Sequence, residues 1–266
     1  MNDSFNSMRE NKISVVINTY NAQTYLDQVL ESVRQFDEIV ICDMESTDAT
    51  ISIAEKHHCK IVNFPKANHK SAEPARTFAI QSASYPWILV VDADEIVSEK
   101  LRVTLYRHIS QEHAAEGVYI PRTNLFMGKY MNCAFPDYQL RFFIREDTTW
   151  PPYVHTIPKI KGLTKRLPKD KSLAFAHLAN DNIHSIIEKD NRYSDDDVEK
   201  KAKKNYGLGA LNGRPFWRIF KCYILEGGFK DGTRGLIYAL LKGQYQFFLV
   251  SKIIEKRLTQ PKIRNV

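Results

Sequence analysis

Glycine is scarce in the front part of this 266-residue chain. None occurs before Gly117, and nine of the eleven glycines lie at or after Gly162. A P-loop and a dinucleotide-binding turn both need glycine where the backbone closely approaches a phosphate. The amino-terminal part therefore lacks both motifs, which argues against kinase-like, GTPase-like and NAD-dependent functions.

Paired cysteines and long apolar runs are also missing. The four cysteines show no CxxC spacing, and they are Cys42, Cys59, Cys133 and Cys222. This argues against a structural zinc site and a disulfide framework, and it suits a reducing cytoplasm. No apolar run approaches the roughly 20 residues that span a bilayer. The first twelve residues are polar and contain no apolar core of a secretory signal.

Acidic residues become rare in the second part of the chain. Residues 1–158 carry 15 Lys+Arg and 20 Asp+Glu, whereas residues 159–266 carry 23 and 11. The overall content of 43% apolar and 26% charged residues is that of a globular protein. The sequence therefore predicts a folded chain that is acidic in front and basic behind.

Short apolar segments alternate with helical patterns in the first 110 residues. Strands are expected at 13–18, 38–42, 60–63 and 87–91, and helices at 22–34, 47–57, 72–83 and 98–108. Such alternation indicates βαβ units and a mostly parallel sheet with helices on both faces. We expect antiparallel strands at 117–122 and 139–144, loops over 150–171, and helices from Asn180 to the end.

Polar residues gather where the expected strands end. Thr19, Tyr20 and Asn21 end the first strand, Asp43 the second, and Asp92, Asp94 and Glu95 the fourth. Ligands of open α/β sheets bind beyond the carboxyl ends of the strands. In an extended segment, Asp92 and Asp94 face the same way, and Mg²⁺ is often held by one or two carboxylates plus phosphate oxygens. The pattern predicts a metal-bridged diphosphate, and the alternative is a solvated turn.

These segments together resemble the family 2 glycosyltransferases. The matching stretches are Ile13–Asn21 (ISVVINTYN), Asp43–Thr50 (DMESTDAT), Arg76 within AR-x-x-AI, and Val90–Glu95 (VVDADE). More narrowly, the rest resembles bacterial lipopolysaccharide-core and surface-glycan transferases, through Asp137–Phe143 (DYQLRFF), Val154-His155 and the spacing from His177 to Ser194. The resemblance implies the GT-A fold in a catalytic domain over residues 1–178, with a helical carboxyl-terminal region over 179–266.

The resemblance also implies roles for individual residues. Nucleotide-sugar-binding roles fall on Thr19, Tyr20, Asn21, Asp43, Glu45, Arg76 and Asp92. Asp94 would bind Mg²⁺ or Mn²⁺ together with a histidine, for which we expect His155 and keep His177 as the alternative. The general base of an inverting transfer would be Asp137, with Glu95 as the alternative.

The basic carboxyl-terminal part mixes aromatic residues with lysine and arginine over residues 216–258. This mixture is typical of helices that lie on an anionic membrane, and the alternative is a helical subdomain packed on the catalytic core. We therefore expect a peripheral protein at the inner face of the cytoplasmic membrane. Its helical region would be the part that contacts the acceptor or the membrane surface.

The predicted reaction moves a sugar from a nucleoside diphosphate to a lipopolysaccharide, lipid-linked or other surface-glycan acceptor. Uridine diphosphate is the carrier that the resemblance implies. A sugar nucleotidyltransferase or a nucleotide-sugar hydrolase is the enzymatic alternative. A basic nucleic-acid-binding protein is the non-enzymatic alternative, but no recognised nucleic-acid motif is present, so we expect no nucleic-acid partner.

Overall fold

The structure is a computed structural model, which describes residues 10–67, 73–146, 148–151, 157–179, 182–201 and 206–259. The chain divides into two compact units. The first comprises Met1–Thr123 and Pro136–Leu178, and the second comprises Asn124–Phe135 and Ala179–Val266. Residues 124–135 fall within the catalytic domain that the sequence predicts, whereas the structure groups them with the helices of the second unit.

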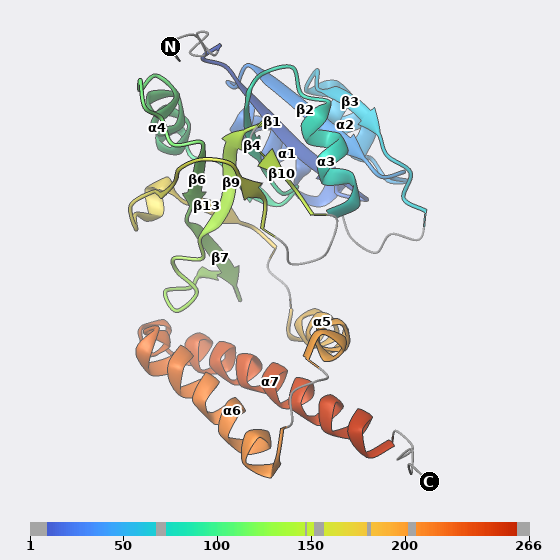
Figure 1. Cartoon of the computed structure of the whole chain (residues 1–266), viewed down its shortest axis with the longest axis vertical. Helices are drawn as coiled ribbons and strands as arrows, with labels where there is room; N and C mark the ends of the chain where they lie inside the picture. The colour runs from blue at the N-terminus through green and yellow to red at the C-terminus, as the bar shows by residue number, and fades with distance from the viewer. Residues whose placement is uncertain are drawn as a thin grey trace, which may run out of the picture. The chain divides into compact units, whose positions relative to one another are not determined.

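A seven-stranded sheet in the order β12-β6-β9-β4-β1-β2-β3 forms the centre of the first unit (Figure 1). Its strands are β1 (Ile13–Thr19), β2 (Glu38–Asp43), β3 (Lys60–Asn63), β4 (Trp87–Val90), β6 (Gly117–Ile120), β9 (Gln139–Ile144) and β12 (Thr164–Arg166). The first four strands run parallel, and β9 pairs antiparallel with both β4 and β6. The predicted mixed sheet is confirmed. Strand β12, which lies in a segment expected to be loop, pairs parallel with β6 at the edge.

Helices cover both faces of this sheet, as predicted. They are α1 (Gln23–Val33), α2 (Thr50–Lys56), α3 (Glu73–Gln81) and α4 (Glu99–Ile109). In β1, Val15 and Ile17 belong to the buried cluster that includes residues of α1, α2 and α4. Val16 points the other way and joins the cluster of α3 residues. Alternate side chains of a strand point to opposite faces, so a fully apolar strand indicates a sheet that is covered on both sides.

Short elements complete the first unit. They are β5 (Glu95–Ile96), β10 (Thr148–Thr149), β11 (Lys159–Ile160), β13 (Phe175–His177) and the 3₁₀ turn η1 (Lys171–Leu173). Strand β13 pairs antiparallel with β5, which places His177 directly opposite Glu95. Strand β7 (Arg122–Phe126) begins in this unit and continues into the second, where it forms a hairpin with β8 (Lys129–Tyr130).

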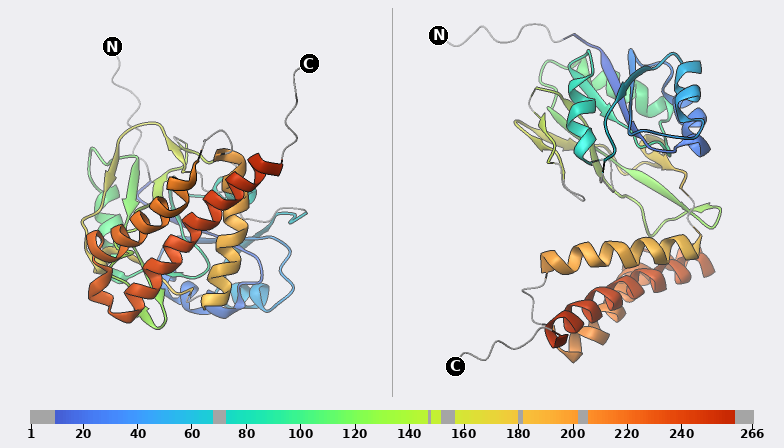
Figure 2. Two further views of the ribbon diagram at one scale, coloured as in Figure 1. Left: turned by 90° about the horizontal axis from the view of Figure 1, so that it is seen from below. Right: turned by 90° about the vertical axis from the view of Figure 1, so that its right-hand side faces the viewer.

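The second unit consists of this hairpin and the carboxyl-terminal helices, of which α6 and α7 run side by side (Figure 2). The helices are α5 (Ile183–Lys201), α6 (Leu208–Phe220), the π-helical turn η2 (Lys221–Leu225), the 3₁₀ turn η3 (Gly228–Asp231) and α7 (Thr233–Thr259). The helical pattern predicted from Asn180 is confirmed. None of the helices in the described part of the chain combines the length and apolar character needed to cross a membrane.

A buried carboxylate, Asp231, attaches the hairpin to these helices. Its oxygens accept hydrogen bonds from the backbone N–H of Asn132 at 2.8 Å, from Asn132 Nδ2 at 2.7 Å, and from the N–H of Cys133 at 3.2 Å. Cys133 also packs in one apolar cluster with Cys222 of η2 and Ala239 of α7. A buried acceptor bonded to three donors is costly to remove, because each donor would be left unsatisfied.

Two helical glycines of this unit have opposite surroundings, which gives a prediction. A Cβ at Gly235 would overlap the backbone carbonyl oxygen of Gly228, whereas one at Gly213 would meet nothing within 4 Å. Gly213→Ala should raise the free energy of unfolding by up to about 1 kcal/mol through helix propensity. Gly235→Ala should lower it by about 1–3 kcal/mol through overpacking. Urea unfolding followed by circular dichroism checks both, and equal signs for the two variants would contradict the packing of η3 against α7.

Candidate active site

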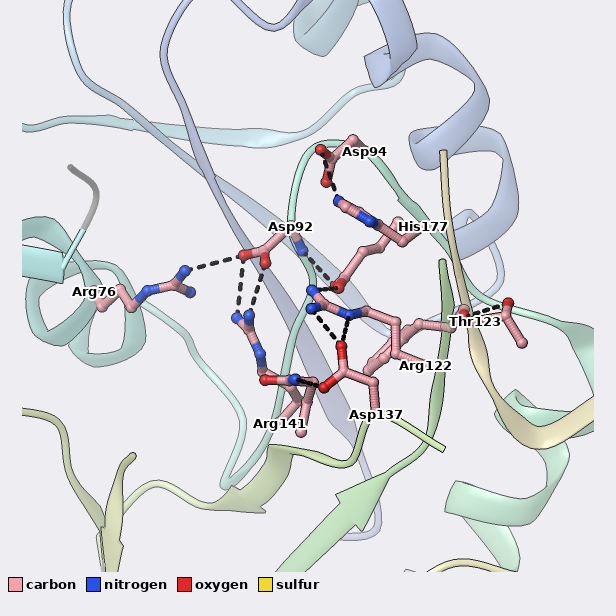
Figure 3. A network of polar contacts seen from close by, with 11 residues as sticks. Arg76, Asp92, Asp94, Arg122, Thr123, Asp137, Arg141 and His177 are labelled. Carbon is pink, nitrogen blue, oxygen red and sulfur yellow. Dashed lines mark hydrogen bonds and ion pairs between the residues drawn. The ribbon is translucent and has the colours of Figure 1, made fainter. Parts of the chain in front are cut away.

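Asp92, just beyond β4, accepts hydrogen bonds from two buried arginines (Figure 3). Arg141 of β9 binds it with both terminal nitrogens, at 3.1 and 2.7 Å, and Arg76 of α3 donates from Nη2 at 3.0 Å. Partial burial acts to raise the pKa of Asp92, but the two guanidinium groups outweigh it and hold the pKa well below its usual range. One ionised carboxylate therefore joins β4, β9 and α3.

Glu95 and Asp137 share a single guanidinium, that of Arg122. Arg122 donates from Nη1 to Glu95 Oε1 at 3.1 Å, and from Nε and Nη2 to Asp137 Oδ2 at 2.9 and 2.6 Å. The Glu95 side chain is fully buried, whereas that of Asp137 is 34% exposed. Burial, together with the charge of Asp92, raises the pKa of Glu95 above its ordinary value. Only Asp137 of this pair is open to an incoming molecule.

Asp94 turns away from this network toward His177 of β13 (Figure 3). Asp94 Oδ2 and His177 Nε2 lie 3.3 Å apart, and both side chains are partly exposed. Burial acts to lower the pKa of His177, but the hydrogen bond and charge of Asp94 outweigh it and raise the pKa. The structure thus brings Asp94 together with His177, the alternative metal-binding histidine. The preferred histidine, His155, lies outside the described residues.

Thr19 and Asp43 end the neighbouring strands β1 and β2, and they are bonded to each other. Thr19 Oγ1 donates to Asp43 Oδ1 at 2.8 Å, and both residues are buried. The same carboxylate accepts from Ser46 Oγ at 2.6 Å and from the Ser46 N–H at 2.8 Å. In this structure, these two predicted nucleotide contacts hold the loop after β2 against the end of β1.

The other predicted residues of this edge reach the surface. Asn21 has a left-handed backbone with φ of 48°, and its Oδ1 accepts from the Thr47 N–H at 2.8 Å. Tyr20 is 46% exposed and lies under the ammonium of Lys66, with Nζ 4.3 Å from the ring centroid. The backbone N–H of Lys66 donates to Glu45 Oε2 at 3.2 Å. Tyr20, Glu45 and Lys66 therefore form an exposed group beside the polar network.

Arg76 has hydrogen-bonding capacity that the described residues leave unused. Its Nε and Nη1 are buried and have no acceptor among them. The guanidinium carbon of Arg76 lies 4.9 Å from the centroid of the Trp150 indole. The guanidinium carbon of Arg141 lies 5.8 Å from the same centroid. Buried N–H groups without an acceptor are rare in folded proteins, so Arg76 is suited to donate to an anionic ligand.

Three parts of this site were not assigned from the sequence. The sequence predicts no role for Arg122 or Trp150, and it marks Arg141 only through the DYQLRFF resemblance. The sequence contains little to mark these arginines, because an isolated arginine looks like a surface charge unless its partner is known. Their partners here lie 15 to 49 residues away in the sequence. The Leu-Arg dipeptide at the start of β9 was the one usable signal, since a cation in a buried strand requires a buried anion.

A family model described as glycosyl transferase family 2 matches residues 14–167, which is more than half of the chain. The chain belongs to glycosyl transferase family 2. This family 2 chain is therefore a glycosyltransferase, and the sugar nucleotidyltransferase and hydrolase alternatives are not supported. The predicted family and its GT-A architecture of a mixed sheet covered by helices are confirmed.

Similar proteins extend over most of the chain. An uncharacterized glycosyltransferase of Rickettsia conorii is 25% identical over 96% of this chain and 93% of its own length. The lipopolysaccharide core biosynthesis glycosyltransferase LpsC of Rhizobium meliloti is 24% identical over 92% of each. Among solved structures, Staphylococcus aureus TarS 1-349 in complex with UDP has a TM-score of 0.49 and 16% identity, over 92% of each chain.

The arginine–aspartate network predicts a stability effect. Arg141→Met should lower the free energy of unfolding at pH 7 by about 2–3 kcal/mol, less than the loss of a fully buried partner, because Asp92 is partly exposed and keeps Arg76. Since the folded-state pKa of Asp92 is depressed, this stabilisation is present above about pH 4 and is lost as the pH falls. Urea unfolding at pH 7 and below pH 4 measures both effects.

Arg102→Met is the matched control, because Arg102 pairs with the exposed Glu99 on the surface of α4. Its loss should stay within about 1 kcal/mol. Equal losses for Arg141→Met and Arg102→Met at pH 7 would contradict the role assigned to Asp92.

Proposed function

We propose that this glycosyltransferase moves a sugar from a uridine diphosphate carrier to a hydroxyl of a lipid-linked or lipopolysaccharide acceptor, with inversion at the anomeric carbon. The observation that carries the proposal is the Asp94–His177 pair beside the Asp92 network, at the carboxyl edge of the sheet. The name of LpsC, which is similar over nearly the whole chain, supports the class of acceptor.

Asp94 and His177 fit a divalent cation that is bound together with substrate. Carboxylate oxygen and imidazole nitrogen are both ligands of such metals, and here they lie 3.3 Å apart. No group of three or more His, Cys, Asp or Glu in the described part of the chain could hold a metal alone. Mg²⁺ commonly takes only one or two carboxylates and completes its shell with phosphate oxygens and water. When bound, Mg²⁺ or Mn²⁺ supplies positive charge that stabilises the departing diphosphate.

Asp137 is the better of the two candidates for the general base. The acceptor oxygen bonds to the anomeric carbon, the bond from that carbon to the diphosphate breaks, and the hydroxyl proton passes to the base. Asp137 is partly exposed and can meet an acceptor, whereas Glu95 is enclosed. Arg76, whose buried Nε and Nη1 have no acceptor in the part of the chain that the structure describes, would donate to the nucleotide diphosphate.

The metal pair gives a direct test. Asp94→Ala and His177→Ala should each lower the Mn²⁺-dependent transfer rate, Asp94→Ala by on the order of 100-fold, as expected for lost stabilisation of transition-state charge. Both should also lose the extra thermal stabilisation that Mn²⁺ gives in the presence of UDP. His184→Ala is the control, because His184 is exposed on α5 and pairs there with Glu188 of the same helix. Unchanged Mn²⁺-dependent stabilisation in Asp94→Ala would remove the metal assignment.

A membrane location is supported by the exposed face of α6 and η2, which we call the aromatic face. It consists of Phe216, Trp217, Phe220, Ile224 and Leu225, each 39–72% exposed. Residues 208–225 contain Arg214, Arg218 and Lys221 and no acidic residue. Aromatic and aliphatic side chains flanked by cations suit an anionic lipid surface, so we propose that this face binds the inner leaflet of the cytoplasmic membrane.

The aromatic face predicts charge-dependent binding to vesicles. Phe216→Ser with Trp217→Ser should weaken co-sedimentation with phosphatidylglycerol vesicles by about tenfold or more, since each buried aromatic side chain contributes about 1.5–3 kcal/mol. Added salt should weaken binding of the wild type. Point substitutions are preferable to truncation, because the apolar cluster around Cys222 and Ala239 would be opened by removing α7.

Leu163→Ser is the control for this experiment. Leu163 is 75% exposed but lies in the first unit, away from the aromatic face in sequence and outside its helices. If the double variant binds vesicles as well as Leu163→Ser does, the membrane proposal is wrong. If the wild type forms a dimer that the double variant loses, without any change in vesicle binding, the face would be assigned to self-association instead.

A further inference from the structure

Arg122 holds two carboxylates with different surroundings through different nitrogens. Nη1 binds the buried Glu95. Nε and Nη2 both bind Oδ2 of the partly exposed Asp137 (Figure 3). A planar guanidinium has its donors in a fixed fork, so fixing one edge also fixes the direction of the other. The position of Asp137 is therefore tied to that of Glu95.

Glu95 is in turn held by backbone contacts close to Asp92, Asp94 and His177. Its Oε2 accepts the backbone N–H of Asp92 at 3.1 Å, and its backbone pairs with that of His177 between β5 and β13. The backbone carbonyl oxygen of the preceding residue, Asp94, accepts a hydrogen bond from the Leu178 N–H at 2.8 Å. Glu95 thus has a fixed place relative to both the Asp92 carboxylate and the Asp94–His177 pair.

Burying a carboxylate completely is costly in free energy. Transfer of a charged group from water to the interior costs several kcal/mol unless it is paired and hydrogen-bonded. Both Glu95 oxygens have charged or backbone donors, and neither side-chain oxygen is exposed. Its geometry suits a tether that connects groups rather than a group that meets substrate.

We propose that Glu95 and Arg122 are positioning residues, which set the Asp137 carboxylate at a fixed place relative to the bound donor. The proposal rests on the function proposed above, with Asp137 as the general base. Glu95 fixes Arg122, Arg122 fixes Asp137, and Gln139 Nε2 supports the other Asp137 oxygen at 2.9 Å. Proton acceptance then occurs at the distance and angle that the transfer requires, since displacement of a catalytic group by about 1 Å can cost on the order of 100-fold in rate.

Two conservative variants separate this role from donor binding. Glu95→Gln keeps the shape but removes the charge that holds Arg122, and Arg122→Lys keeps the charge but cannot bind both carboxylates in a fork. Each should lower kcat about 10- to 100-fold and leave the Kd for UDP with Mn²⁺ within about twofold. Glu99→Gln is the matched control, because Glu99 pairs with Arg102 at the surface of α4, and its kcat should not change.

A double-mutant cycle with Asp137→Asn decides the proposal. If Glu95 and Arg122 act through Asp137, Glu95→Gln and Arg122→Lys should lower the residual kcat of Asp137→Asn by less than about threefold, since linked residues are not additive. Full additive losses, or an equal loss of UDP affinity, would overturn it. If Glu95→Gln does not fold, as judged by circular dichroism and Tm, the Arg122→Lys cycle decides alone.

Failure of this proposal can be told from failure of the proposed function. If Asp137→Asn transfers sugar at the wild-type rate, the assignment of the base is wrong and the positioning role falls with it. If Asp137→Asn lowers kcat by about 10²- to 10⁴-fold, as expected for loss of a general base, but the cycle is additive, only the positioning role is wrong.

Discussion

The pairing of Asp92 with Arg76 and Arg141 is the constraint on which the geometry of this glycosyltransferase depends. The three residues come from different elements, and the two arginines are buried, so none can move without leaving a charge unpaired. Buried ion pairs add little net stability compared with apolar packing, but breaking one is costly. The network therefore acts mainly as a geometric device, which fixes the end of β4 and with it the positions of Asp94 and Glu95.

The central sheet was predictable because its signals are local. Strands β1, β2 and β4 are short apolar segments, and their helices carry apolar residues at the right spacing. The rule that ligands bind at the carboxyl edge then selected Asp43, Asp92 and Asp94 without any coordinates. The rule predicts proximity, but it does not say which side chains face a ligand. Asp43 proves to be bonded to Thr19, whereas Asp94 faces His177.

The features that sequence reasoning did not predict depend on long-range partners. Arg122 ends a segment for which the sequence predicts only a strand, and its role follows from two carboxylates that the fold brings to it. Strand β12 lies at the sheet edge beside β6 and packs little apolar surface. Its residues are therefore polar and lack the apolar pattern from which a strand is predicted. His177 stands in a three-residue strand whose pairing with β5 could not be derived from its own residues.

The segment of residues 124–135, which contains the β7–β8 hairpin, determines how the helical unit could be exchanged between related chains. The backbone leaves the first unit after Thr123, returns at Pro136, and leaves again after Leu178. Met131 and Cys133 of the hairpin are buried in the second unit, and Asp231 binds the hairpin there. The helices cannot be exchanged by themselves. A chimaera that exchanged only residues 179–266 would combine the hairpin of one protein with the helices of another. Recombination that preserves folding must exchange two separate segments together, and both crossover points of the shorter one lie within two residues of Arg122 or Asp137.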